Sequence, residues 1–359
     1  MAYSTIDKPS SYFNTKLYTG NNNVTQTISG VGFQPDFTWI RCRNSAEYNH
    51  LADAVRGANK FLHSNLTDAE RTGSYNDGSN TMAFTSDGFS LTNPTATDDE
   101  LNFGSRLYCS WNWKANGAGS SNTSGTITST ASANTTSGFS IVSYTGNGTS
   151  GATVGHGLGV APKMLIAKNR QTASNWGVWH TGIPMNEHLI LNGTQASSVY
   201  TGFFNNTSPT STLVTLGNDT VTNENTKSII LYCFAEVKGF SKFGSYTGNG
   251  NADGTFVYTG FKPSYIMIKY SSGASEGWTI IDNKRNTYNP ESLYLYANTS
   301  GTEGTETGGV DFLSNGFKIR NSYGYTNNSG GTYIYSCFAE NPFVSSKGLP
   351  TTARWFGLF

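Results

Sequence analysis

Two glycine-rich stretches of the chain match patterns that build enzyme sites. Residues 146–151 read G-x-G-x-x-G, which in dinucleotide-binding proteins places a pyrophosphate at the start of a helix. Residues 273–277 read G-x-S-x-G, which in hydrolases places a serine nucleophile between a strand and a helix. The residues after each stretch do not favour a helix, because 152–157 contains two glycines and 278–281 reads as a strand. We therefore predict surface turns at both places, with no catalytic and no cofactor-binding residue.

Histidines and carboxylates are the other residue types that could do chemistry, as metal ligands. His180 and His188 are eight residues apart, with no set of cysteines or carboxylates around them, and the remaining histidines are scattered. Asp98, Asp99 and Glu100 could contact calcium, but they lack the alternating oxygen ligands of a calcium-binding loop. A solvated acidic turn is the favoured interpretation, and we predict no metal site and no cofactor.

One pattern occurs three times and organises the chain. It begins with Tyr-Thr-Gly at 18–20, 144–146 and 246–248, and a proline follows 17, 18 and 17 residues after the tyrosine. A third landmark is a cysteine that lies 74, 71 and 74 residues beyond the proline, at Cys109, Cys233 and Cys337. The copies start 126 and 102 residues apart, which is too long for a solenoid repeat and long enough for a self-contained core. We therefore expect three tandem domains.

Short runs of aromatic and β-branched residues, separated by turn dipeptides such as Asn249-Gly250 and Asn315-Gly316, indicate antiparallel strands. The predicted fold is all-β: three tandem antiparallel β-sandwich domains of jelly-roll or lectin-like type, with few short helices. The expected order is a polar lead-in, module 1, a Gly/Ser/Thr-rich linker, module 2, module 3 and an apolar C-terminal tail, at 1–16, 17–114, 115–137, 138–239, 240–343 and 344–359.

Composition limits the partners. The net charge is zero and only 13% of residues are charged, so no cluster of lysines and arginines marks a nucleic-acid interface. We expect no membrane insertion, because no apolar run approaches the roughly 20 residues of a membrane span. No apolar segment near Met1 predicts a signal peptide. Cysteines at one repeated position of separate domains would be too far apart to pair, so we expect four reduced cysteines.

Binding residues are expected where the copies differ. Trp176 and Trp278 occupy matching places in two copies, which favours a role in the core. Four aromatic residues outside the repeated pattern are candidate receptor contacts: Tyr323, Tyr325, Phe203 and Phe204. Four residues of the apolar tail are candidate assembly contacts, on a neighbouring domain or subunit or on module 3 itself: Trp355, Phe356, Leu358 and Phe359.

The repeated motifs also carry a family resemblance. Tyr-Thr-Gly-Asn-Gly, Gly-Phe-x-Pro, Ser-Trp-Asn-Trp-Lys at 110–114 and Cys-Phe-Ala-Glu together resemble the structural virion proteins of tailed phages, especially marine and cyanobacterial ones. The resemblance extends from about Tyr3 to Phe343. Members of this family are often labelled tail fibre or virion structural protein, and the family has no catalytic motif. The resemblance implies a component of the particle, on the tail or on the head.

Three functions follow as hypotheses. The favoured one is a tail fibre, tailspike or baseplate-periphery protein that contacts the host surface, where weak contacts with a glycan gain strength from multivalency. Such a protein is expected to be a homotrimer, to bind other virion proteins, and to be made in the host cytoplasm without a signal peptide. The alternative is a capsid decoration or head-fibre protein. A glycan-degrading enzyme is the least favoured, because the carboxylate pattern does not support it.

Overall fold

The structure is a computed structural model that describes residues 3–73, 81–93, 100–273 and 275–351. Strands make up 44% of the chain and helices 3%, so the predicted all-β class is confirmed. Neighbouring strands of the sheets pair antiparallel, as in the ladders at the start of each module. In the described part of the chain, no helix is long and apolar enough to cross a membrane.

Each module contains a main sheet with the same order of its first five strands, in which the module's first strand pairs with its last. In module 1 the order is β1 (Phe13–Thr19), β9 (Leu107–Trp113), β3 (Phe37–Cys42), β4 (His50–Asp53), β5 (Lys60–His63) and β6 (Arg71–Thr72). In module 2 it is β12 (Phe139–Thr145), β19 (Ser228–Phe234), β14 (Met164–Asn169), β15 (Gly177–His180), β16 (Glu187–Ile190) and β17 (Ser198–Val199). In module 3 it is β20 (Ser241–Thr247), β27 (Thr332–Pro342), β22 (Phe261–Tyr270), β23 (Trp278–Asp282) and β24 (Glu291–Tyr296).

A smaller set of strands forms the second layer of each module. It comprises β2 (Thr25–Ser29), β8 (Gly88–Thr92) and β7 (Thr81–Thr85) in module 1, and β13 (Thr153–Gly155) with β18 (Leu213–Thr215) in module 2. In module 3 the strands continue from β24 through β25 (Gly304–Leu313), β26 (Gly316–Ile319) and β21 (Phe256–Tyr258). The helices are single turns: a 3-10 turn η1 (Pro9–Ser11), α1 (Thr220–Asn223) and α2 (Gly324–Asn327).

The segment predicted to be a linker, 115–137, instead contributes strands to module 2. Here β10 (Ser120–Asn122) and β11 (Ser129–Asn134) extend the main sheet from the edge of β12. Its small polar side chains resemble those of a flexible linker, but the free edge of β12 supplies backbone partners that such residues can use. The predicted lead-in, 1–16, overlaps β1, which starts at Phe13, and the side chain of Phe13 is only 2% exposed.

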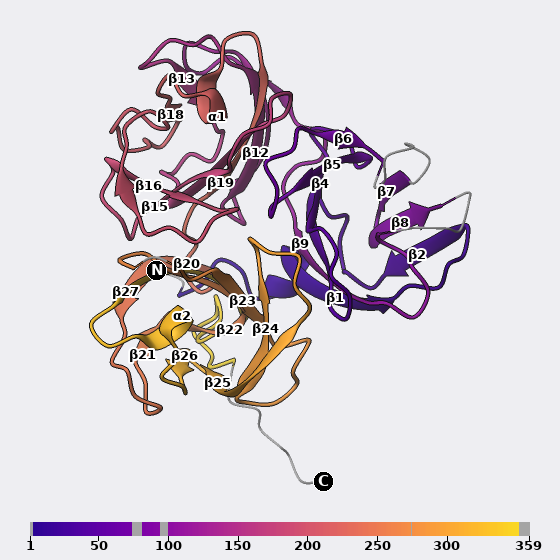
Figure 1. Cartoon of the computed structure of the whole chain (residues 1–359), viewed down its shortest axis with the longest axis vertical. Helices are drawn as coiled ribbons and strands as arrows, with labels where there is room; N and C mark the ends of the chain where they lie inside the picture. The colour runs from indigo at the N-terminus through magenta and orange to yellow at the C-terminus, as the bar shows by residue number, and fades with distance from the viewer. Residues whose placement is uncertain (1–2, 74–80, 94–99, 274, 352–359) are drawn as a thin grey trace.

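The three modules meet at one shared centre, which the three lobes of Figure 1 surround. Three aromatic residues lie at or near the end of the last strand of their modules: Trp113, Phe234 and Phe338. Each pairs with the residue two positions after the recurring proline. Their ring centroids lie 6.3 Å apart between Trp113 and Phe234, 5.6 Å between Trp113 and Phe338, and 6.3 Å between Phe234 and Phe338. Matching residues of different modules therefore touch, contrary to the expectation that matching positions lie far apart.

The contacts between modules close into a ring. Trp176 of module 2 donates its Nε1 hydrogen to the carbonyl of His63 in module 1, at 2.9 Å. Trp278 of module 3 makes the same bond to Ile190 of module 2, also at 2.9 Å. Asn49 of module 1 completes the cycle through Nδ2, 2.7 Å from the carbonyl of Ala297 in module 3. Trp176 and Trp278 are 0% and 1% exposed, in accord with the predicted core role.

The main sheet of module 1 is buried on both faces, one against the shared centre and the other against the core of its own module. On β3, Phe37 and Trp39 face the shared core while Ile40 and Cys42 face the core of module 1. Successive side chains of a strand point to opposite faces of the sheet, so they reach the two cores in turn. All six residues of β3 are buried for this reason.

The Tyr-Thr-Gly motif fixes the turn that precedes the last strand of each module. The hydroxyls of Tyr18, Tyr144 and Tyr246 donate to backbone carbonyls of that turn at 2.9, 2.6 and 2.6 Å. A Cβ on the glycine of each motif would lie only 2.1, 2.3 and 2.4 Å from a carbonyl oxygen of the same region. The motif therefore serves packing. The stretch at 146–151 leads into strand β13 and residues 275–277 lead into strand β23, whereas Ala274 lies outside the described residues.

The cysteine landmark needs one correction. Cys233 pairs with Leu165 and Cys337 with Ile266, each three residues after the recurring proline. In module 1 the residue at that place is Asn112, whereas Cys109 lies three positions away, opposite Arg41. The Tyr-Cys dipeptide therefore stands at different registers of the last strand in module 1, at 108–109, and in module 2, at 232–233. All four cysteines are buried free thiols.

Candidate functional site

The same place in each module carries different chemistry, and we call it the turn site. It lies where the fifth strand in the sheet order (β5, β16 or β24) approaches the turn that precedes the module's last strand along the chain (β9, β19 or β27). Asn102, Asn223 and Asn327 mark that turn, because their side-chain oxygens accept matching backbone N–H groups at 3.0, 2.9 and 2.9 Å. Two residues before them stand Glu100, Val221 and Tyr325, and matching positions of the fifth strands hold His63, Ile190 and Tyr296.

The turn site of module 3 is a cluster of four tyrosine rings. Tyr325 lies 5.5 Å from Tyr294, 6.3 Å from Tyr296 and 5.6 Å from Tyr323, measured between ring centroids. Tyr323 and Tyr325 are nearly parallel, with 8° between their planes. Tyr323 is 41% exposed and the other three rings are half-buried. The cluster therefore offers aromatic surface to solvent from a rigid support.

A buried carboxyl group anchors this cluster. The Tyr325 hydroxyl donates to Glu306, and Asn321 donates its Nδ2 hydrogen to the other carboxyl oxygen at 3.1 Å. Burial raises the pKa of Glu306 to about 8, because the charged form loses its hydration. The carboxyl group is thus largely protonated at neutral pH, and its bonds hold Tyr325 in place.

The turn site of module 2 is a polar hollow open to solvent, lined in part by His188, Tyr200 and Asp219. The Tyr200 hydroxyl donates to Asp219 at 2.5 Å, and this hydrogen bond is the main reason that the pKa of Tyr200 rises to about 12. The His188 ring lies 5.3 Å from that of Tyr200, and partial burial lowers the pKa of His188. The hollow can accept hydrogen-bonding groups, but Tyr200 and Asp219 already bond to each other and His188 Nδ1 lies 3.1 Å from the carbonyl of Ser198.

The turn site of module 1 is buried and holds His50, His63 and Glu100, which are 1%, 1% and 7% exposed. His50 Nε2 lies 2.7 Å from Glu100 Oε2, and His50 Nδ1 lies 3.1 Å from the carbonyl of Tyr48. Neither ring nitrogen of His63 has a hydrogen-bond partner among the described residues. Burial, followed by the charges of His50 and Arg71, lowers the pKa of His63 well below its ordinary value.

This cluster corrects two expectations. His50 and His63 are not isolated, because the β4–β5 hairpin sets them directly opposite each other. Glu100 is buried against His50 rather than solvated, while Asp98 and Asp99 lie outside the described residues. The 13-residue spacing of the histidines gave no signal, and only the strand pairing brings them together.

The predicted contact residues have different fates. Tyr323 and Tyr325 belong to the tyrosine cluster of module 3. Phe203 and Phe204 are 4% and 3% exposed and pack in the core, so they offer little surface for contact, although Phe203 borders the hollow of module 2. Their apolar side chains lie next to a polar loop in the sequence, but the fold turns them inward. The four candidate assembly contacts, Trp355, Phe356, Leu358 and Phe359, lie outside the described residues.

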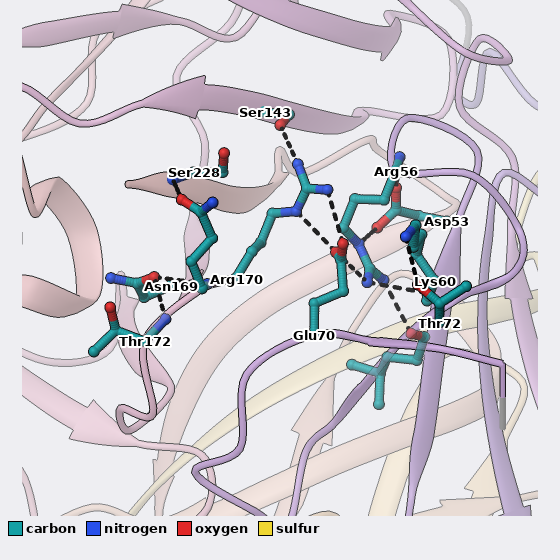
Figure 2. Close-up of polar contacts among 12 residues, drawn as sticks. Asp53, Arg56, Lys60, Glu70, Thr72, Ser143, Asn169, Arg170, Thr172 and Ser228 are labelled. Atoms are coloured by element: carbon teal, nitrogen blue, oxygen red, sulfur yellow. Dashed lines mark hydrogen bonds and ion pairs between the residues drawn. The ribbon is translucent and has the colours of Figure 1, made fainter. Parts of the chain in front are cut away.

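A dense ionic network at the contact of modules 1 and 2 is the other candidate (Figure 2). Arg56 contacts Asp53 at 2.5 Å and Glu70 at 3.2 Å, and Glu70 also pairs with Arg170 of module 2 at 2.8 Å. Tyr232 of module 2 donates to Asp53 at 2.8 Å. Asp53 and Arg56 have fully buried side chains, and the charges compensate one another. We assign this network to module packing.

The family described as "Domain of unknown function (DUF7483)" matches residues 8–342, a span that includes all three copies of the repeat. None of the curated proteins matches the sequence.

Proposed function

The chain belongs to the family described as Domain of unknown function (DUF7483), and we propose that it is a structural protein of a tailed-phage particle. We place it in a tail fibre, tailspike or baseplate-periphery component that contacts a glycan of the host surface. The resemblance of its repeated motifs supports the particle assignment. The exposed tyrosine cluster of module 3 supports the contact.

The tyrosine cluster is the observation that carries the contact. Aromatic faces bind the C–H faces of sugars. An exposed ring that is already packed against buried rings loses little conformational entropy when it binds a ligand. Tyr323 provides the exposed face, and its stacking on Tyr325 holds it in place. The same site in modules 1 and 2 has other residues, so contact through one module per chain would be weak. Many copies on a particle would make it effective.

Binding to a glycan array tests the contact. We expect the purified chain to bind a subset of host-surface saccharides and Tyr323→Ala to reduce that binding. Tyr288→Ala is the matched control, because Tyr288 is 83% exposed in the same module but outside the cluster. Binding that survives Tyr323→Ala, or that Tyr288→Ala reduces equally, would contradict the assignment of the cluster. We expect no shortening of any bound polysaccharide.

A capsid decoration or head-fibre protein is the second candidate. The three modules form a closed ring within one chain, and a body of this kind suits a threefold position of a shell. Electron microscopy of phage particles with a labelled antibody separates the candidates, since label on the capsid alone would exclude a tail component. The predicted homotrimer would add a second level of assembly, and sedimentation of the purified chain measures it.

A further inference from the structure

The buried turn site of module 1 has the donor atoms of a metal centre. One ligand atom from each of His50, His63 and Glu100 lies within 4.8 Å of the others. Two imidazoles and a carboxylate are a donor set that borderline divalent cations prefer, and an inward shift of side chains brings such atoms to bonding distance. In the part of the chain that the structure describes, this is the one group of at least three such ligands.

His50 is already oriented as a ligand. A carbonyl oxygen can only accept, so the contact between His50 Nδ1 and Tyr48 places the ring proton on Nδ1. The lone pair of Nε2 then points toward Glu100. Metal-binding histidines commonly donate their second nitrogen to a backbone carbonyl in this way. The short contact to Glu100 therefore requires a proton between the two groups, which a cation can replace.

His63 is the second, independent observation. Its ring is buried beside that of His50, with 4.7 Å between centroids, and neither nitrogen is bonded among the described residues. Burying a polar ring without a partner costs stability, and such groups need an explanation. Modules 2 and 3 hold Ile190 and Tyr296 at this position and do not bury an imidazole there.

We propose that His50, His63 and Glu100 bind one divalent cation of the borderline class that includes Zn²⁺. Such a cation would join β4, β5 and the turn before β9. The residues beside both histidines contact module 3, since Asn49 and Ser64 each donate to the carbonyl of Ala297 at 2.7 and 2.6 Å. The carbonyl of His63 accepts from Trp176 of module 2. The cation would therefore stabilise the junction of all three modules.

Zinc binding to the full chain tests the proposal. The protein is stripped with a chelator, dialysed and titrated with ZnCl₂ by calorimetry, and its metal content is measured after gel filtration. We expect one zinc per chain, a higher Tm with zinc, and no comparable effect of Mg²⁺ or Ca²⁺, which prefer oxygen ligands. Cobalt should give the visible absorption of a nitrogen- and oxygen-bound ion.

Three variants complete the test. Glu100→Gln preserves a hydrogen bond to His50 but removes the carboxylate, and His63→Ala removes a ligand. Each should weaken zinc binding by more than about 100-fold, beyond the usual effect of losing a supporting residue. His188→Ala, at a half-buried histidine of module 2, should bind as the wild type does. Circular dichroism verifies folding, and if His63→Ala does not fold, Glu100→Gln decides. Absence of stoichiometric zinc in the wild type, or equal binding by Glu100→Gln, would overturn the proposal.

Discussion

Two kinds of contact hold the three modules together, although the repeat makes their positions equivalent. Asp53, His180 and Asp282 are matching residues, because each pairs with the residue two positions after the recurring proline. Module 1 meets module 2 through Asp53 and its network, and module 3 meets module 1 through Asp282. In the third contact, between modules 2 and 3, the uncharged His180 takes the place of the aspartate, and we call it the neutral contact for this reason. The same backbone geometry thus accepts two solutions to the burial of polar groups.

The two ionic networks share their construction. Arg285 contacts Asp282 at 2.7 Å and Glu303 at 3.0 Å, as Arg56 contacts Asp53 and Glu70. Glu303 then pairs with Arg43 of module 1 at 2.8 Å, and Trp111 donates to Asp282 at 3.0 Å. Burial opposes ionisation of Asp282, but Arg285 and these hydrogen bonds hold its pKa below its ordinary value.

At the neutral contact, uncharged residues take the places of the charged residues of the two networks, although Lys242 of module 3 still pairs with Glu236 of module 2 at 2.9 Å. His180 bonds to the carbonyl of Tyr335 at 3.1 Å, Ile183 lies three residues on in place of an arginine, and Ser197 bonds to the carbonyl of Ser271. A backbone bond recurs at all three contacts: the N–H groups of Glu70, Ser197 and Glu303 donate across them at 2.8, 2.8 and 2.7 Å. The comparison teaches that the backbone fixes the ring, while the side chains set how each contact responds to mutation and pH.

The largest expected effect is the loss of one buried arginine. Arg285→Ala leaves Asp282 and Glu303 without their shared cation, and removing one partner of a buried pair costs about 3–5 kcal/mol. Urea unfolding of the purified chain measures the loss. Arg320→Ala is the matched control in module 3, because its exposed pairs should contribute at most about 1 kcal/mol. Equal effects of the two variants would show that the network carries no special weight.

The next largest effect is expected in the pH dependence of stability, which should differ between the contact that contains His180 and the contact that contains Asp282. Burial lowers the pKa of His180 to about 3, from an ordinary value of 6.5. The unfolded chain binds the extra proton first, so the stability of the neutral contact decreases as the pH falls from about 6.5 toward 3. The carboxylate of Asp282 contributes above its ordinary pKa of 3.8 and loses that contribution only at lower pH.

A single variant isolates the histidine. The wild type should lose about 1.4 kcal/mol per pH unit relative to His180→Asn between about pH 6 and pH 4. Unfolding curves at a series of pH values provide the difference. A difference that does not change with pH would mean that His180 is not kept neutral by burial.

The smallest effect is expected from the neutral contact itself. Ser197→Ala removes the hydroxyl bond to Ser271 but leaves the backbone bond between the same residues. One neutral hydrogen bond is worth about 0.5–1.5 kcal/mol, so the midpoint of urea unfolding should shift only slightly. A loss as large as that of Arg285→Ala would remove the distinction between the contacts.

The turn sites show how far the sequence reaches. Tyr323 and Tyr325 were identified because they depart from the repeat, and the structure places both in one cluster. The same criterion selected Phe203 and Phe204, but both side chains are buried. The sequence alone does not tell whether the side chains of a loop face solvent or the core. The criterion did not identify the histidines of module 1, because their proximity depends on the register of β4 and β5.

The sequence by itself determined the all-β class, the three copies and the packing roles of the tyrosine and glycine of each motif, because these depend on local spacing and on residue type. Only the tertiary structure decided that the copies close around one aromatic centre, that two of the three contacts hold a buried ionic network, and that His50, His63 and Glu100 meet. These features join residues up to 260 positions apart, as Arg43 and Glu303 are. The repeated motifs and the strand pattern depend on residues that are close together in the sequence. Contacts between residues far apart in the sequence depend on how whole sheets pack.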